Sequence, residues 1–171
     1  MAIIIKANAD VTAEENRRLD NISDLAYGED DSNLAWTDEQ DWRVWLEIDG
    51  EIVSFLTIIQ RTARVGETPV RLGGVGGVAT HPAHQRKGYA AQVMSAAGAF
   101  MHDTLHVDFG HLLCSPELLP YYARFGWQPV QGPLLVDQPG GKISLDHIHM
   151  ILPCASEHWP AGTLDLCGLP W

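Results

Sequence analysis

The chain has 171 residues, a net charge of −11 and three cysteines. A chain of this length buries about 70% of its unfolded surface, so a single domain can fold without disulfide bonds. No apolar run approaches the ~20 residues of a membrane span, and the first ten residues lack the pattern of a signal peptide. The odd number of cysteines and the absence of CxxC spacing argue against a disulfide framework, so we expect a cytoplasmic protein.

The charges are distributed unevenly along the chain. Residues 1–51 carry 14 acids and 4 bases, residues 52–102 carry 1 acid and 5 bases, and residues 103–171 carry 7 acids and 2 bases. Phosphate binding along a nucleic acid needs clustered Lys and Arg, so the acidic balance argues against a general nucleic-acid binder. Acidic solubility charges placed around a buried centre would give the same pattern, so charge alone does not assign a function.

The first half of the chain favours strands with one helix. Residues 2–6 are a short apolar run typical of a strand, and Thr12 to Glu15 has capping-box spacing, which predicts a helix over residues 13–27. The acidic stretch 28–40 predicts a loop or short helix. Alternating residues 44–48, the Asp49-Gly50 turn and residues 52–60 predict a hairpin, and a further strand is expected over residues 70–80.

The second half begins with a helical pattern. Residues 87–102 predict a buried helix, residues 111–114 a short strand, and Pro116 the start of a helix that reaches about Phe125 and ends at Gly126. Two late strands are expected over residues 130–136 and 146–152. Hairpins followed by strand–helix–strand–helix indicate an α/β protein with a mixed sheet and helices on its faces.

A glycine-rich segment, residues 73–90, contains the residues that indicate a binding site. Four glycines weaken a strand and suggest a bulge or the close approach of a ligand. The strand is followed by Gln85-Arg86-Lys87-Gly88 at the start of a helix, where free amides and two cations form an anion site suited to a pyrophosphate. Lys87-Gly88 has the reverse order of a P-loop. The G-x-G-x-x-A match at residues 74–79 lies inside a strand, so a dinucleotide-binding turn is also rejected.

This segment resembles a known family signature. Gln85-x-x-Gly88-x-Ala90, after a strand that ends in Val78-Ala79-Thr80, resembles the acetyl-CoA signature of the GCN5-related N-acetyltransferase (GNAT) superfamily. Residues 121–127, Tyr-Tyr-Ala-Arg-Phe-Gly-Trp, resemble its second signature. The resemblance implies an acyl-CoA N-acyltransferase fold with splayed parallel strands at 70–80 and 111–114. It also implies a domain over residues 1–152, with an extension over 153–171 that packs on the same domain or on a dimer interface.

The resemblance also implies roles for individual residues. Acetyl-CoA would lie between the splayed strands, with pantetheine paired to the strand end like an added strand and the pyrophosphate held by the following turn. Tyr122 matches the tyrosine that protonates the departing CoA thiolate; a tyrosine with a pKa near ~10 is a suitable donor, and the alternative is a packing role beside Tyr121. The implied acetyl-CoA-binding residues are Val78, Ala79, Thr80, Gln85, Arg86, Lys87, Gly88, Tyr89 and Ala90.

The general base is left open. Many family members use a Glu on the strand that corresponds to residues 70–80, whereas this strand has no acid and Gly76 stands where one would be expected. His81 and His84 have a suitable ordinary pKa but lie beside the phosphate turn. We therefore consider a water relay that ends at a backbone carbonyl near Gly76, or at an acid from the N-terminal loop.

Several segments are similar to the aminoglycoside 2'-N-acetyltransferases, a subgroup linked to antibiotic resistance. They are the acidic Trp-containing stretch 38–45, Ile59-Gln60-Arg61, Gln131-Gly132-Pro133 and a last residue Trp171, although Leu169-Pro170 lack an acid that the subgroup can place there. Acidic walls would attract a polycationic aminosugar. The substrate-binding residues implied by this similarity are Glu29, Asp30, Asp31, Asp146 and Trp171.

Other acceptors and another function class stay open. A polyamine, an amino-acid derivative or a peptide N-terminus would also supply a primary amine, and a CoA-binding regulatory domain would bind without catalysis. His147 and His149 offer two imidazoles without a third ligand, so we expect no metal, and Cys114 is expected to be a small core residue rather than a nucleophile. The expected partner is a small cationic amine, with no nucleic acid and no membrane; the resemblance leaves a homodimer open.

Overall fold

A computed structural model describes residues 1–28 and 32–171. Its ten described strands form one mixed sheet in the order β6-β9-β5-β4-β3-β10-β7-β8, with β2 and then β1 added along the first half of the long strand β3. The bounds are β1 (Ala2–Ala7), β2 (Trp42–Ile48), β3 (Glu51–Val65), β4 (Thr68–Thr80), β5 (Phe109–Cys114), β6 (Gln128–Val130), β7 (Leu134–Gln138), β8 (Gly141–Leu145), β9 (Ile148–Pro153) and β10 (Leu164–Asp165).

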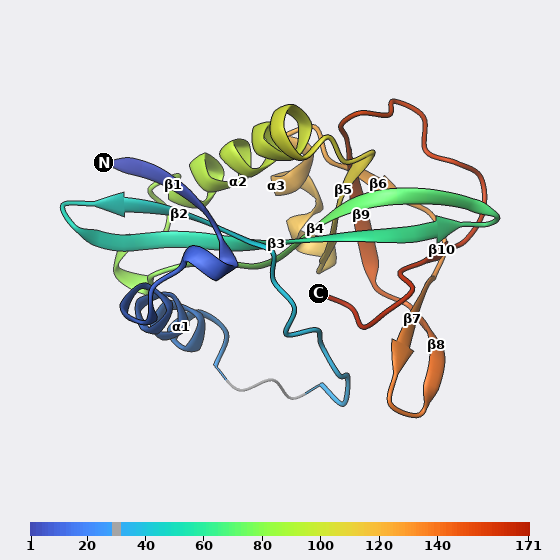
Figure 1. Cartoon of the computed structure of the whole chain (residues 1–171), viewed down its shortest axis with the longest axis horizontal. Coiled ribbons are helices and arrows are strands. Elements are labelled where there is room, and N and C mark those ends of the chain that lie inside the picture. Colours follow the sequence, from blue (N-terminus) through green and yellow to red (C-terminus); the bar gives the residue numbers. More distant parts are fainter. Residues whose placement is uncertain (29–31) are drawn as a thin grey trace.

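The three α-helices of residues 1–28 and 32–171 cover the two faces of the sheet (Figure 1). α1 (Ala13–Tyr27) lies on one face, whereas α2 (Tyr89–Phe100) and α3 (Leu119–Ala123) lie on the other. The mixed α/β fold expected from the sequence is confirmed. No helix among the described residues is both long and apolar enough to cross a membrane.

The start of α1 shows how the sequence sets an element. The Thr12 hydroxyl accepts a hydrogen bond from the Glu15 amide at 3.2 Å, and the Glu15 carboxylate accepts one from the Thr12 amide at 2.9 Å. This reciprocal pair satisfies two amides that the helix leaves unpaired, which confirms the predicted capping box. Leu19 and Ile22 then pack against Trp45 of β2, so α1 is held by the sheet beneath it.

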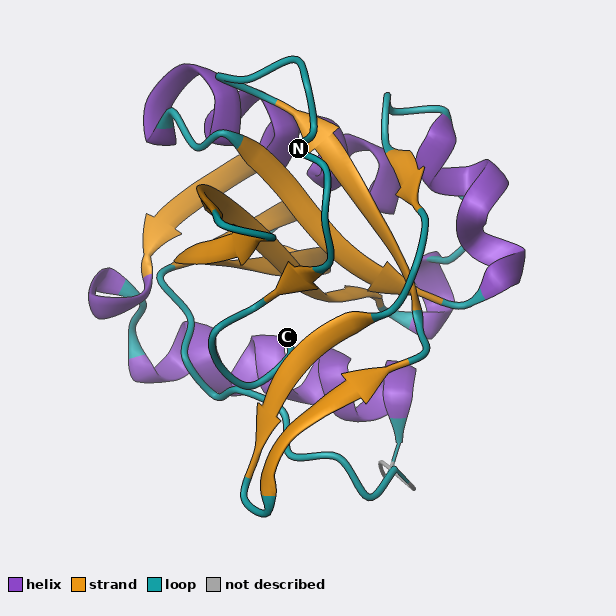
Figure 2. Cartoon of the chain, turned by 90° about the vertical axis from the view of Figure 1, so that its right-hand side faces the viewer, coloured by secondary structure: helices purple, strands orange, loops and turns teal. Residues whose placement is uncertain are grey.

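The second half departs from the prediction in three places. The single strand expected over residues 130–136 is wrong, because Gly132 at φ +93° and Pro133 separate β6 from β7. The expected helix 116–125 is shorter, because a 3₁₀ turn over Pro116–Leu118 precedes α3. Strand β8 was not expected at all. It pairs with β7 to form a hairpin that ends the sheet and extends away from the other strands (Figure 2).

The last segment of the chain returns to the sheet. Residues 164–165 form β10, which pairs antiparallel with β3 and parallel with β7. The chain then runs inward, and the C-terminus lies between the β7–β8 hairpin and the middle of the sheet (Figure 1). Trp171 is thereby placed against the centre of β4, beside strands that are far from it in the sequence.

Candidate functional site

The two central parallel strands separate partway along their length. β4 and β5 pair over four positions only, from Leu72 opposite Phe109 to Val75 opposite Leu112. Beyond these positions β4 continues along β3, and β5 continues along β9. A bulge where Gly77 has φ +59° bends β4 at this point. The edge of β4 that faces β5 therefore has unpaired backbone groups from Gly76 onward.

A turn after β4 presents free amides to solvent. Gly88 is the N-cap of α2 with φ +79°, and as a glycine it has no side chain to cap the helix. The first amides of a helix have no partner within the helix, so those of α2 are available to a ligand. The space beside Gly88 is open, because a Cβ there would meet no atom within 4 Å. The Gln85 amide group donates to the Thr80 carbonyl at 3.3 Å, and the Lys87 ammonium donates to the Ala83 carbonyl at 3.1 Å. With Arg86 exposed beside it, this turn fits a pyrophosphate.

The end of β4 leads directly into that turn. Val78 and Thr80 are half-buried, whereas the Ala79 side chain faces the core at 3% exposure. The Val78 carbonyl accepts a hydrogen bond of 2.5 Å from the Tyr27 hydroxyl at the end of α1. This contact cannot be predicted from the sequence, because Tyr27 lies 51 residues before Val78 and its spacing indicates only the end of a helix.

Tyr122 is buried near the opening between β4 and β5. It lies on α3 with 6% of its surface exposed, and burial raises its pKa above the usual value, with further contributions from Tyr27, Cys114 and Tyr121. Its hydroxyl is therefore protonated at neutral pH and can act as a proton donor. Burial, and then Glu117, also raise the pKa of the Cys114 thiol, so this cysteine is not a ready nucleophile.

Trp171 lies directly on the glycines of β4. A Cβ on Gly74 would overlap the indole ring, at 2.5 Å from Cδ2 and 2.6 Å from Cζ2. The indole Nε1–H donates to the His111 carbonyl at 3.3 Å, and the Arg61 guanidinium lies over the ring at 5.0 Å. The main-chain carbonyl carbon of Trp171 lies 3.4 Å from the place that a Cβ on Gly76 would take. A residue predicted to bind substrate thus stands where the two central strands separate.

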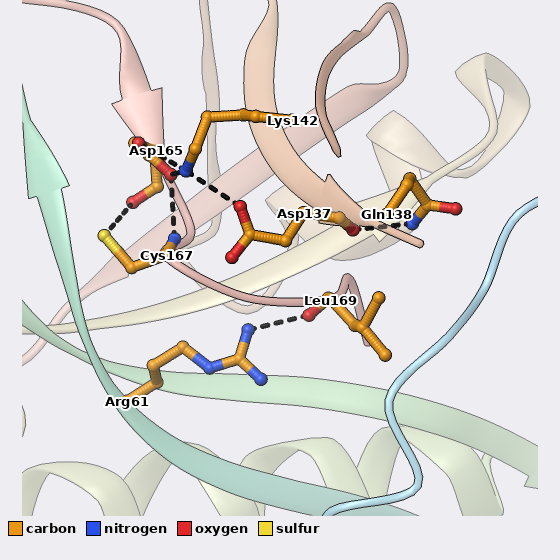
Figure 3. A network of polar contacts seen from close by, with 7 residues as sticks. All are labelled: Arg61, Asp137, Gln138, Lys142, Asp165, Cys167 and Leu169. Carbon is orange, nitrogen blue, oxygen red and sulfur yellow. Dashed lines mark hydrogen bonds and ion pairs between the residues drawn. The ribbon is translucent and has the colours of Figure 1, made fainter. Parts of the chain in front are cut away.

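A polar network holds the segment that leads to Trp171 (Figure 3). The Lys142 ammonium on β8 bonds Asp165 at 2.6 Å and Asp137 at 3.0 Å, and the Asp165 carboxylate accepts from the Cys167 amide at 2.8 Å. Arg61 on β3 donates to the Leu169 carbonyl at 2.7 Å. Partial burial alone would raise the pKa of Asp165, but the bonds from Lys142 and Cys167 lower it. The segment is therefore fixed to both β3 and the hairpin.

Two histidines form a buried pair behind Trp171. His111 on β5 and His149 on β9 are 0% and 1% exposed, with Nε2 of the first 3.3 Å from Nδ1 of the second. His149 Nε2 bonds the Gly132 carbonyl at 3.2 Å, and burial lowers the pKa of both rings. His149 is thus engaged in the core. In the described part of the chain no three His, Cys, Asp or Glu side chains are grouped to hold a metal.

Of the acids predicted to bind the acceptor, the structure describes Asp146. Glu29, Asp30 and Asp31 lie outside the described residues. Asp146 lines a pocket of about 340 Å³ whose other walls are Leu119, Pro129, Val130, Gln131, Gly132, Pro133, His147 and Ile148. Gly132 in the wall of this pocket bonds His149, which contacts His111 beneath Trp171, so a chain of contacts links the pocket with Trp171.

Comparison with known proteins decides the family. A model of the acetyltransferase (GNAT) domain matches residues 10–130, a range that includes β4, the turn before α2 and the segment with Tyr122. The chain belongs to the GNAT acetyltransferase family. Members of this family use acetyl-CoA as cosubstrate, so the expected enzyme class, an acyltransferase of type EC 2.3.1, is confirmed. The family does not specify the acceptor.

Solved structures support the fold. An acyl-CoA N-acyltransferase from Pseudomonas aeruginosa is 20% identical, with 88% of this chain and 98% of that chain covered and a TM-score of 0.63. A GNAT family acetyltransferase from Brucella melitensis in complex with acetyl-CoA is 15% identical, with 95% and 94% covered and a TM-score of 0.63. A probable N-acyltransferase from Enterococcus faecalis is 15% identical with a TM-score of 0.59; the match covers 75% of this chain but only 33% of that protein. No curated protein matches the sequence.

Proposed function

We propose that this GNAT domain transfers an acetyl group from acetyl-CoA to a primary amine by direct attack. The observation that carries the proposal is the separation of β4 from β5, which ends at the open turn before α2. Pantetheine would pair with the backbone of Val78 and Thr80, and the amides over residues 85–90 would hold the pyrophosphate. The Tyr27 hydroxyl would release the Val78 carbonyl when pantetheine binds there.

The chemical step needs one proton acceptor and one proton donor. The neutral amine attacks the thioester carbonyl, so that an N–C bond forms and the C–S bond then breaks. One proton leaves the nitrogen through water. Tyr122 donates a proton to the departing sulfur and regains one from solvent; burial raises its pKa, so the hydroxyl carries its proton at neutral pH. The described part of β4 has no carboxylate for the first transfer.

An aminoglycoside is the first candidate acceptor. The acidic stretch before β2 contacts both the tail and β3, since the Thr37 amide donates to the Pro170 carbonyl at 2.8 Å and Glu39 lies 3.6 Å from Arg61 on β3. Asp146 adds a carboxylate at the adjoining pocket. These charges, with Glu29, Asp30 and Asp31, would attract a polycation and guide an amine toward Trp171.

A thiol-release assay tests the proposal. Acetyl-CoA is mixed with the protein and with kanamycin-like aminoglycosides, polyamines or peptides, and each product is analysed by mass spectrometry. We expect saturable, amine-dependent release of CoA and an acetylated aminoglycoside. Acetylation of a peptide or polyamine alone would reject the first acceptor while keeping the reaction. Acetyl-CoA binding without release of CoA by any amine would instead identify a regulatory CoA-binding domain.

A further inference from the structure

The last residue of α1 bonds the backbone of β4 beyond the point where β4 and β5 separate. The Tyr27 hydroxyl donates a hydrogen bond of 2.5 Å to the Val78 carbonyl. Tyr27 as a whole is 57% exposed, yet burial raises the pKa of its hydroxyl to about 12, so the hydroxyl end of the side chain is the covered part. The hydroxyl therefore keeps its proton, and can donate this bond, throughout the physiological pH range.

The Val78 carbonyl belongs to a part of β4 that the neighbouring strands do not pair regularly. The register of β4 against β3 passes from Gly76 to Ala79 across a bulge, so Val78 has no residue opposite it on β3. Pairing of β4 with β5 has already ended at Val75. A bulge disrupts the ladder locally and leaves backbone groups open to donors from outside the sheet. The backbone carbonyl expected to bind pantetheine is thus occupied by a side chain of the protein itself.

A second observation relates the Tyr27 hydroxyl to the expected acetyl-CoA site. After burial itself, the interaction with Tyr27 is the largest contribution that raises the pKa of Tyr122. Tyr27 belongs to α1 and Tyr122 to α3, and these helices lie on opposite faces of the sheet (Figure 1). Side chains from opposite faces interact most readily where no strand separates them, as beyond the last paired position of β4 and β5. The two hydroxyls therefore approach the same opening from its two sides.

The surroundings of Tyr27 allow its hydroxyl to leave Val78. Tyr27 belongs to none of the three hydrophobic clusters found among the described residues. Gly28 follows it at φ +66°, and a Cβ on Gly28 would meet no atom within 4 Å. Because little packs on the ring or on the residue after it, the main cost of moving the hydroxyl away from β4 is the loss of one hydrogen bond.

We propose that Tyr27 competes with pantetheine for the Val78 carbonyl and thereby lowers the affinity of the protein for both acetyl-CoA and CoA. This inference rests on the proposed acetyl transfer, in which pantetheine pairs with β4, and adds to it a residue that sets the affinity. A pantetheine N–H gains its bond only after the Tyr27 bond breaks, so binding exchanges one hydrogen bond for another. Because substrate and product share the pantetheine arm, the contact also limits the retention of CoA after transfer.

Binding measurements with and without the pantetheine arm test this inference. In isothermal titration calorimetry Tyr27→Phe should bind acetyl-CoA and CoA about threefold to tenfold more tightly than the unmodified protein, the usual effect of one hydrogen bond between uncharged groups. The nucleotide 3'-phospho-ADP, which has the phosphates of CoA but lacks pantetheine, should bind both proteins equally. Without ligand, Tm of Tyr27→Phe should fall by about 2–4 °C, because the free protein loses the bond. Tyr121→Phe is the matched control and should change none of these values, since the Tyr121 hydroxyl has no hydrogen-bond partner among the described residues.

The outcomes separate this inference from the proposed function. Weaker binding of acetyl-CoA by Tyr27→Phe would mean that the hydroxyl contacts the ligand, and unchanged binding would mean that it does not compete. Either result overturns the inference, while the transfer reaction stands. Equal tightening of 3'-phospho-ADP, or an unchanged Tm of the free variant, would overturn it as well. If the unmodified protein binds no acetyl-CoA, the proposed function fails and the inference fails with it.

Discussion

The contact between Gly74 and Trp171 gives a direct test of how the tail is held. Gly74→Ala would put a methyl group 2.5–2.6 Å from two indole atoms, whereas real Cβ contacts lie almost entirely beyond 3.0 Å. The ring must therefore move by roughly 1 Å or the strand must shift. Overpacking of this kind costs about 1–3 kcal/mol, and the better strand propensity of Ala returns only ~0.5–1 kcal/mol.

The expected free-energy change follows from what the indole would lose. Moving the ring weakens its bond to the His111 carbonyl, worth about 1 kcal/mol, and its contact with Arg61, worth ~0.5–1 kcal/mol. We expect Gly74→Ala to lower the free energy of unfolding by about 2 kcal/mol, and thus Tm by roughly 4–8 °C in a chain of this size. KM for the amine should rise, because Trp171 stands where β4 and β5 separate and is predicted to bind the acceptor.

Urea denaturation followed by circular dichroism measures the effect, with Trp171→Ala and the double variant completing a cycle. Without the indole the added methyl group has room, so the double variant should be no less stable than Trp171→Ala, which gives a coupling of about 2 kcal/mol. Gly140→Ala is the matched control, since its Cβ would meet no atom within 4 Å. Additive effects of Gly74→Ala and Trp171→Ala would refute the reasoning.

Three further predictions address the proposed reaction. Tyr122→Phe should lower kcat by about 10²–10⁴ and leave KM for acetyl-CoA unchanged, with Tyr121→Phe as the control. Because the pKa of Tyr122 is raised, its hydroxyl should still carry its proton above pH 9. A rate that already declines at a pH lower than 9 in the unmodified protein, but not in Tyr122→Phe, would contradict the acid role. Arg86→Ala should raise KM for acetyl-CoA about threefold to tenfold and leave KM for the amine unchanged in steady-state assays. Asp146→Asn should raise KM for a polycation only, with a smaller effect at high salt; equal effects on both substrates would mean a solvated surface charge.

Local signals in the sequence were enough for much of the fold. The capping box of Thr12 and Glu15 fixed the start of α1, and the Asp49-Gly50 turn joined two alternating runs into β2 and β3. The expected strand over residues 70–80 and the helix after it are present as β4 and α2. These features depend on neighbours in the chain, so spacing alone reveals them.

Contacts between distant segments could not be predicted. Trp171 bonds His111, 60 positions away, and Tyr27 bonds Val78, 51 positions away. Residues so far apart in the chain leave no periodic pattern in the sequence that would predict these contacts. The pairing of His111 with His149 depends on the register of β5 against β9, whereas the sequence showed only that His147 and His149 are two residues apart. The split between β6 and β7 depends on Gly132 at φ +93° and on Pro133, and two such residues in an apolar run do not by themselves distinguish a strand break from a bend.

The glycines of β4 explain why side chains from distant segments lie against this strand. At Gly73 a Cβ would meet the Met101 Sδ at 2.5 Å, at Gly74 it would meet the Trp171 ring, and at Gly76 it would contact the Trp171 carbonyl carbon at 3.4 Å. Each glycine therefore gives space to a group from another segment, on both faces of one strand. A carboxylate on β4 would need that space for its own side chain. The strand instead supplies backbone groups and room, so we expect side chains of other segments, Trp171 of the tail among them, to orient the acceptor. Weakening the contacts that hold the tail, such as the bond from Arg61 to the Leu169 carbonyl, should for this reason change KM for the amine more than KM for acetyl-CoA.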